Sequence, residues 1–223
     1  TVRKVWGKNC FVRSCPGLER FDGSRIGGCA VAVRGGWVNR CKGVISDQRG
    51  WGRYLVLKLS GSTNIWLTIC YFAYLNNDRE SSSYMEMQRK AMDDIDNDKA
   101  SNEHMPVTDG KYDSQKLLCR DLEELKLQAE AHGAEIVIAG DFNEQYLHGT
   151  DRRLHNWMDN VMHMKNVLHN GNETGNETCF SKEGGTDIDW ICTTQKIADP
   201  RKHRCWIHEF SIGGMHRPTF MEC

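Results

Sequence analysis

The stretch EIVIAGDFN at residues 135–143 decides the fold of this chain. Its apolar residues occupy both faces of an extended chain, which is typical of a buried strand in an α/β protein. A helix is predicted directly before it, because apolar side chains recur there at helical spacing. These side chains are Leu117, Leu118, Leu122, Leu125 and Ala129. Asp113 or Ser114 is expected to cap this helix and Gly133 to end it, and a helix that runs into a buried strand predicts an α/β fold.

The end of that strand carries the first candidate functional residues. A strand's period of two places Asp141 and Asn143 on the same face, just after the apolar run. In open α/β sheets, ligands bind at the carboxyl ends of the strands, so an acid and an amide that emerge there indicate a functional site. The alternative is that residues 140–143 only form a turn, because Gly, Asp and Asn are ordinary turn residues.

Four more strands are predicted on either side of this stretch. Residues 28–34 follow a glycine pair and alternate small and β-branched side chains. Residues 53–59 and 65–72 are β-rich runs separated by a turn-forming segment, which predicts a hairpin. The segment DIDWICTT at 187–194 predicts a further short strand.

The segment 76–112 differs in composition from the rest of the chain. It holds nine acidic and five basic residues and few large aliphatic ones, which predicts an insert or long loop. Within it, apolar residues recur at helical spacing after Ser83 and Glu86, a pair that fits a capping box, so a short amphipathic helix is expected there. Another short helix is expected around Trp157, with Asp151 as its cap.

The bulk composition predicts one compact domain. With 223 residues, of which 39 % are hydrophobic and 26 % charged, the chain can bury a large core and has the length of a single domain. The formal net charge is −1, so composition gives no support to the strong positive field that nonspecific nucleic-acid binding favours. The longest apolar runs are too short to cross a bilayer. Residues 1–26 show no apolar core of a signal peptide, and an intracellular location is favoured over secretion.

The ten cysteines are scattered without the CxxC pairs that zinc sites usually show. Buried or free thiols are therefore expected, and a disulfide between Cys10 and Cys15 stays open as an alternative. Asn172 and Asn176 begin Asn-Glu-Thr sequons, which would accept glycans only in a secreted chain.

Two further segments hold candidate polar residues. In the strand predicted at 187–194, Asp187 and Asp189 share one face, so one of these acids is expected near the edge of the core. Towards the carboxyl end, His216 follows two glycines and precedes Arg-Pro. A single histidine is ordinarily a satisfied surface or core residue, so His216 alone indicates little.

In their order along the chain, three of these segments resemble the last three signature motifs of the endonuclease/exonuclease/phosphatase family. They are Gly-Asp-Phe-Asn at 140–143, Thr-Asp-Ile-Asp-Trp-Ile at 186–191 and His-Arg-Pro at 216–218. Tyr71 also matches the family, with Ala73 in place of its usual proline.

The resemblance implies a domain that spans residues 27–223 and carries 76–112 as an acidic insert or loop. Residues 1–26 are left as an amino-terminal extension that is not matched to the family. The implied fold is a two-sheet α/β sandwich flanked by helices, in four α/β/β/α layers, and incomplete at the amino terminus.

The resemblance also implies roles for five side chains. Asp141 looks like the family's aspartate that orients or deprotonates the attacking water, and Asn143 like its amide donor to the scissile phosphate. Tyr71 resembles a tyrosine that contacts the phosphate or shapes the site. Asp189 looks like the carboxylate that holds the catalytic histidine, here His216, in its charged form.

The metal-binding half of the family's site is not matched. Family members hold a divalent cation with a glutamate early in the domain and with an aspartate immediately before the motif histidine. Met215 stands in the second place, and a thioether is a poor ligand for a hard cation. Glu19 lacks the sequence context of the early glutamate. The implied cofactor is therefore Mg²⁺ or Mn²⁺, or none, and hydrolysis is expected to be slow or absent because the metal supplies much of the rate.

Two functions stay open. In the first, the chain is a phosphodiester hydrolase, most similar to the endonuclease domains of non-LTR retrotransposons, and its partner is nucleic acid or another phosphodiester. In the second, it is a non-catalytic scaffold or accessory subunit, and other protein chains cover the sheet edge beside the unmatched start. The matched acids, amide and histidine favour the first function, and Met215 favours the second.

Overall fold

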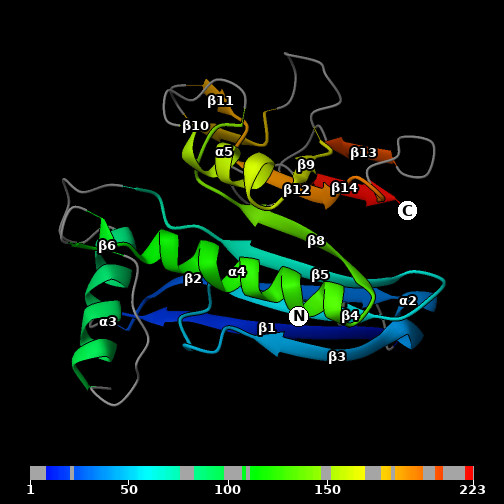
Figure 1. Ribbon diagram of the computed structural model, residues 1–223, viewed down its shortest axis with the longest axis horizontal. Helices are drawn as coiled ribbons and strands as arrows, with labels where there is room; N and C mark the ends of the chain where they lie inside the picture. The colour runs from blue at the N-terminus through cyan, green and yellow to red at the C-terminus, as the bar shows by residue number, and fades with distance from the viewer. Residues whose placement is uncertain are drawn as a thin grey trace.

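A six-stranded mixed sheet forms the centre of the computed structural model (Figure 1). The structure describes residues 9–20, 23–75, 83–97, 107–108, 111–146, 152–168, 177–181, 184–197, 204–207 and 219–222. The strand order is β3 (Cys41–Ser46), β4 (Tyr54–Leu59), β5 (Asn64–Tyr71), β8 (Ala134–Asp141), β12 (Asp189–Thr194) and β9 (Met164–Asn166). Strands β5 and β8 run parallel, and the other neighbouring pairs are antiparallel.

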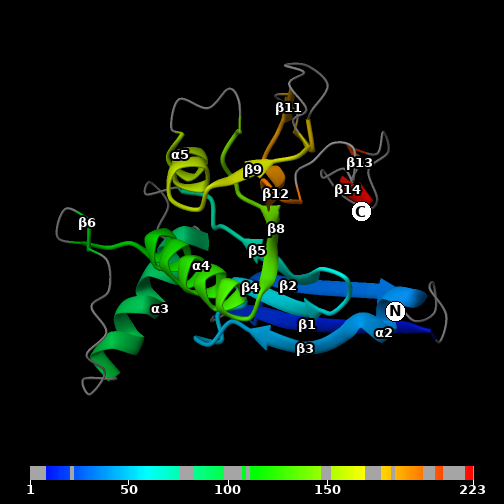
Figure 2. The same cartoon turned by 45° about the vertical axis from the view of Figure 1, so that its right-hand side comes forward.

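Helices cover one face of this sheet, and a β-hairpin covers the other (Figure 2). On the helical face, α4 (Ser114–Ala131) and α5 (Arg153–Asn160) bury their apolar side chains against Ile136, Ile138 and Trp190. On the other face, β1 (Cys10–Glu19) pairs with β2 (Arg25–Arg34) and packs on Leu55 and Leu57 of β4. The predicted α/β sandwich of two sheets flanked by helices is confirmed.

The remaining elements are short or lie at the ends of the sandwich. They are α2 (Gly36–Arg40), α3 (Ser83–Asn97), β6 (Val107–Thr108), β7 (Lys111–Tyr112), β10 (Cys179–Ser181), β11 (Gly184–Thr186), β13 (Arg204–Ile207) and β14 (Thr219–Glu222). The amphipathic helix predicted in the acidic segment is α3. Its Tyr84 and Met87 are buried in the core, whereas Met92 is exposed.

The local predictions around the central sheet are confirmed. Strands β4 and β5 form the predicted antiparallel hairpin, and the buried strand that begins at Ala134 is β8. Asp113 caps α4, since its carboxylate accepts hydrogen bonds from the backbone N–H groups of Gln115 at 3.0 Å and Lys116 at 3.1 Å. Capping satisfies two of the donors that the first turn of a helix leaves unpaired.

Strand β1 was not predicted from the sequence. It contains Pro16 and Gly17, which are unfavourable within a strand. The structure accommodates the proline because it faces Gly28 in the register, and the Gly28 N–H donates instead to the Gly52 oxygen at 3.1 Å. Pairing with β2 therefore overrides the weak local propensity of β1.

The predicted cap of α5 is wrong. The helix begins at Arg153 with Arg152 in the capping position, and the Arg152 side chain makes no capping hydrogen bond. Instead, the Glu144 carboxylate accepts from the N–H groups of Leu154 at 3.0 Å and His155 at 2.9 Å. A carboxylate from the preceding loop thus replaces a cap from the chain immediately before the helix.

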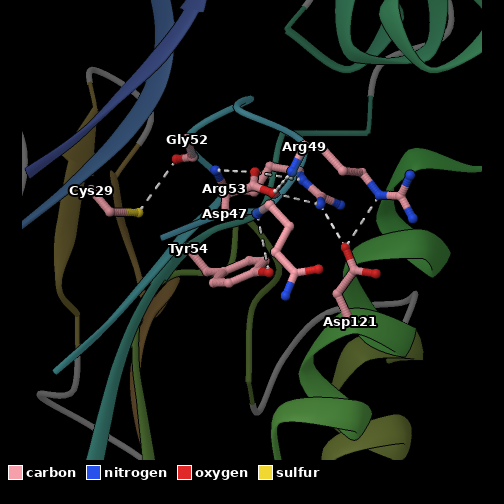
Figure 3. Close-up of polar contacts among 8 residues, drawn as sticks. Cys29, Asp47, Arg49, Gly52, Arg53, Tyr54 and Asp121 are labelled. Carbon is pink, nitrogen blue, oxygen red and sulfur yellow. Dashed lines mark hydrogen bonds and ion pairs between the residues drawn. The ribbon is translucent and has the colours of Figure 1, made fainter. Parts of the chain in front are cut away.

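A buried ion network ties the loop before β4 to α4 (Figure 3). Arg53 donates from Nε to Asp47 Oδ2 and from Nη2 to Asp47 Oδ1, both at 3.0 Å, and from Nη2 to Asp121 Oδ2 at 2.6 Å. Burial lowers the pKa of Arg53, but its hydrogen bonds and the charges of the two carboxylates raise it overall. The Arg53 backbone oxygen also accepts from the Tyr71 N–H at 2.8 Å, so the network lies directly beside the end of β5.

Eight cysteines in the described part of the chain are free thiols, six of them buried and two, Cys41 and Cys119, half-buried, in agreement with the expectation of buried or free thiols. Cys70 and Cys192 lie within the core, and burial holds the pKa of each well above its usual value. Cys10 and Cys15 are free thiols five residues apart on β1. An extended chain separates such residues by about 17 Å, too far for a disulfide. Within the described residues, no helix has both the length and the apolar character to cross a membrane.

Candidate functional site

Three predicted site residues lie in register at the ends of three neighbouring inner strands of the central sheet, β5, β8 and β12. Asp141 ends β8, with Tyr71 of β5 as its partner on the parallel side and Asp189 of β12 as its partner on the antiparallel side. Register partners on neighbouring strands point to the same face of a sheet. The two carboxylates and the phenol therefore emerge side by side at the carboxyl ends of β5 and β8, on the face turned towards the second sheet.

Asn143 is fixed beside these residues by an unusual backbone and two hydrogen bonds. Its φ of 50° lies in the left-handed region, which asparagine tolerates better than most residues. Its backbone N–H donates to Asp141 Oδ1 at 2.9 Å, and its side-chain Nδ2 donates to the Phe72 oxygen at 2.8 Å. An amide nitrogen carries two donor hydrogens, so Nδ2 keeps the capacity for a second hydrogen bond.

Tyr71 is held by close packing of its ring and by polar neighbours. Gly27 has a φ of +69°, and a Cβ added there would come within 2.8 Å of the Tyr71 ring, so only glycine lets β2 approach so closely. Burial raises the pKa of the Tyr71 hydroxyl; a hydrogen bond with Ser83 lowers it, and the Asp141 charge raises it, so that the pKa lies above its usual value. The hydroxyl is therefore protonated at neutral pH and can donate a hydrogen bond.

Asp189 is anchored through its backbone. Its N–H donates to Thr178 Oγ1 at 2.9 Å, and the Thr178 N–H donates to the Thr186 oxygen at 2.8 Å. Burial raises the pKa of the Cys179 thiol, and the negative charges of Asp189 and Asp141 raise it further. The Cys179 thiol is therefore a neutral group at neutral pH.

Stacked aromatic rings support the strand ends from the helical face. Phe142 stacks on Trp190 at 4.2 Å between ring centroids and on Phe72 at 5.1 Å. The Phe142 N–H donates to the Ile188 oxygen, and the Phe72 N–H donates to the Asp141 oxygen, at 2.8 and 2.9 Å. The segment that bears the acids is therefore packed on its helical side, while Asp141, Asn143 and Asp189 are partly exposed.

The remaining predicted site residue, His216, lies outside the described residues, as do Met215, Asn172 and Asn176. Asp187, the other acid of the motif at 186–191, is buried, and its backbone oxygen accepts a hydrogen bond from the Trp190 indole at 2.9 Å. The Asp187 backbone thus stabilises the packing of the core, whereas Asp189 lies at the strand end beside Asp141.

Sequence reasoning missed Ser83 and Thr178, which hold Tyr71 and Asp189 in place. Ser83 was noted only as a helix cap. No local pattern identifies either contact, because each partner lies more than ten residues away.

The donor set at this edge suits a partly hydrated hard cation. Among the described residues, no three His, Cys, Asp or Glu side chains form a metal-binding group. Asp141 and Asp189 nevertheless offer two carboxylates from paired positions. Mg²⁺ is often bound by one or two carboxylates, with water and substrate phosphate oxygens completing its octahedron. The two acids therefore fit an ion that binds together with phosphate rather than one held by a complete protein cage.

The fold is similar to those of solved nucleases. An AP endonuclease from Archaeoglobus fulgidus superposes with a TM-score of 0.57 at 14% identity, over 96% of this chain and 78% of that chain. The endonuclease domain of TRAS1, a telomere-specific non-LTR retrotransposon, gives 0.56 at 13% identity, over 94% and 76% of the two chains.

An endonuclease/exonuclease/phosphatase family protein from Leptotrichia buccalis gives a TM-score of 0.55 at 10% identity, over 99% of this chain and 73% of that chain. The sequence matches no protein-family model and no curated protein. The resemblance predicted from the motifs is thus confirmed as a likeness of fold.

Proposed function

We propose that this chain, which has the fold of endonuclease/exonuclease/phosphatase proteins, is a slow phosphodiester hydrolase acting on nucleic acid. The observation that carries the proposal is the register of Tyr71, Asp141 and Asp189 across three strands, with Asn143 hydrogen-bonded to Asp141. An acid that can accept a proton from water, and an amide and a phenol that can donate to phosphate oxygens, suit water attack on a phosphodiester. Two of the similar structures are named as endonucleases, which favours nucleic acid as the substrate class.

In this proposal each residue has a role, and the role of His216, which lies outside the described residues, is taken from the family resemblance. Asp141 receives the proton of the attacking water, and the Asn143 N–H on Oδ1 fixes the orientation of its carboxylate. The second N–H of the Asn143 amide and the protonated Tyr71 hydroxyl donate to the phosphate oxygens, where negative charge develops. Asp189 orients the protonated ring of His216.

A divalent cation, Mg²⁺ or Mn²⁺, would be held beside this carboxylate pair mainly by phosphate oxygens and water, since Asp141 also serves as the base and Asp189 holds His216. Such an ion supplies charge neutralisation at the phosphate. With Met215 in place of the family's aspartate, the site has fewer anionic ligands, so we expect weak metal binding and slow turnover. We also propose that residues 27–223 make up the family-like domain, with 76–112 as an insert and with the segment 1–26 adding β1 to the second sheet.

A second candidate is a non-catalytic scaffold or accessory subunit. Met215 favours it, because a thioether is a poor ligand for a hard cation. In that case, the fold would serve as a platform for other protein chains.

The test is a cleavage assay with Mg²⁺ or Mn²⁺ on supercoiled plasmid, on an abasic duplex and on a chromogenic phosphodiester. Asp141→Asn removes the base and should lower the rate about 100-fold or more. Asp93→Asn is the matched control, because Asp93 is an exposed carboxylate on α3. Met215→Asp restores the missing ligand and should raise both the rate and the response to Mg²⁺.

Cleavage that is lost in Asp141→Asn and kept in Asp93→Asn supports the hydrolase and removes the scaffold. If neither the native chain nor Met215→Asp cleaves any of the three substrates, the hydrolase is excluded and the scaffold is favoured.

A further inference from the structure

A cavity lies between α4 and α5, on the helical side of the sandwich. It does not include the strand ends that carry Asp141 and Asp189, which are called the acid edge below. Its volume is about 280 Å³. Both views show α5 above the amino-terminal half of α4 (Figures 1 and 2). The side chains that matter here are Gln115, Lys116, Arg120, Arg153, Leu154 and Trp157. None of the roles proposed above uses this cavity.

One wall of the cavity is a fixed aromatic ring. The Trp157 indole Nε1 donates to Glu123 Oε1 at 2.6 Å, which holds the ring in one orientation. Phe72 of the core lies 6.3 Å from Trp157 between ring centroids. Leu154 and Cys119 continue the apolar wall. A wall of this kind suits a flat ring, since stacking on an ordered aromatic side chain restricts little further motion.

The lining carries an excess of positive charge. Lys116, Arg120 and Arg153 are cationic, and Glu123 is the only acid among the lining residues. The Glu123 carboxylate already accepts from the indole, and Arg153 is oriented by Asp113 and Gln115. Lys116 is exposed whereas Arg120 and Arg153 are half-buried, so the ammonium group of Lys116 is the cation best placed to meet an incoming anion. A flat apolar wall under a cationic rim is complementary to a ring that carries a phosphate.

The cavity is joined to the acid edge by two hydrogen bonds. Gln115 Nε2 donates to the Ala73 oxygen at 2.6 Å, and the neighbouring Phe72 oxygen accepts from Asn143 at 2.8 Å. Residues 72–73 thus contact a residue of the cavity on one side and a residue of the candidate site on the other.

We propose that the cavity between α4 and α5 binds one nucleobase together with its phosphate, the base against Trp157 and the phosphate at Lys116. The ligand is either one nucleotide of a strand that also reaches the acid edge or a free nucleotide. The first source rests on the proposed function, and the second does not.

The experiment is titration of the full chain with 5′-AMP and with adenosine, followed by calorimetry and by tryptophan fluorescence, without any divalent cation. Trp157→Leu should weaken binding of both about 5- to 150-fold, the range for loss of one base–aromatic stack. Lys116→Gln should weaken only 5′-AMP, by about two- to fivefold. Lys165→Gln is the matched control, because Lys165 is an exposed lysine outside the cavity.

Equal effects of Lys116→Gln and Lys165→Gln on 5′-AMP, or equal affinities of the native chain for 5′-AMP and adenosine, would overturn the phosphate contact and with it the proposal. Unaltered adenosine binding in a folded Trp157→Leu variant would overturn the base contact. If Trp157→Leu fails to fold, Lys116→Gln still decides, since Lys116 is exposed.

A trinucleotide identifies the source of the ligand. A strand is indicated by tighter binding of the trinucleotide than of 5′-AMP, and a free nucleotide by the reverse order. Because these titrations need no hydrolysis, binding without cleavage would exclude only the proposed hydrolase, and cleavage without base-dependent binding would exclude only the cavity.

Discussion

Replacing Arg53 by methionine should destabilise the protein more than any surface change. The Arg53 side chain is 1 % exposed, and the carboxylate that it clamps, on Asp47, is fully buried. Methionine keeps an unbranched apolar stem but is shorter than arginine. It removes three charged hydrogen bonds and the cation–π contact of the guanidinium with the Trp51 ring, 4.7 Å away. The Asp47 carboxylate would then stay buried without its cation.

Removing one partner of a buried ion pair costs about 3–5 kcal/mol, out of a typical total stability of about 5–15 kcal/mol. For an m-value near 2 kcal/mol/M in urea, the unfolding midpoint should fall by roughly 1.5–2.5 M with an unchanged m-value. The assay is equilibrium urea unfolding followed by circular dichroism. Arg25→Met is the control, because Arg25 pairs with Glu19 at the surface, where both side chains are about half exposed, and its loss should cost about 0–1 kcal/mol.

The double variant Asp47→Asn with Arg53→Met separates the lost charge pair from lost packing. Neutralising the orphaned carboxylate should recover part of the loss, which gives a coupling free energy between the two sites. The reasoning is refuted if Arg53→Met costs no more than Arg25→Met, or if the two changes add without coupling.

Two further predictions concern the site strand and alkaline stability. Gly140→Ala should lower the free energy of unfolding by at least about 1–3 kcal/mol, because Gly140 has a φ of 151° and an added Cβ would lie 1.9 Å from the Cys70 oxygen. Gly43→Ala is the control, since a Cβ added at Gly43 would meet nothing closer than 3.7 Å. Urea midpoints that move equally in both variants would contradict this prediction. Burial raises the pKa of Tyr54 from 10.0 to about 12. A folded-state pKa above the unfolded value gives stability that is present below pH 10 and lost as pH rises towards 12. Tyr54→Phe should therefore lose less stability than the native chain between pH 9 and pH 11, measured as the urea midpoint at each pH. An equally steep fall of the midpoint in both proteins would contradict the raised pKa of Tyr54 as the cause.

Much of the central layer could be predicted from the sequence, because its signals are local. The apolar stripe of α4, its Asp113 cap and the hairpin of β4 and β5 depend on side-chain period and on turn chemistry within a few residues. Strand β1 and the cap of α5 could not be predicted in this way. Strand β1 depends on pairing with β2, and α5 depends on a carboxylate ten residues before Leu154.

For the candidate site, the sequence alone determined that Asp141 lies at the end of a buried strand, since strand periodicity is a property of adjacent residues. Periodicity did not place Asn143, which lies beyond β8 with a φ of 50° and is held by hydrogen bonds to Asp141 and Phe72. Only the tertiary structure decided that Tyr71 and Asp189 stand beside Asp141, because that depends on the register between strands that are 70 and 48 residues away along the chain. Register is set by which face of each strand packs on the helices and which on the second sheet. The link from Arg53 to Asp121, 68 residues apart, has the same origin: folding brings buried charges together that no local pattern connects.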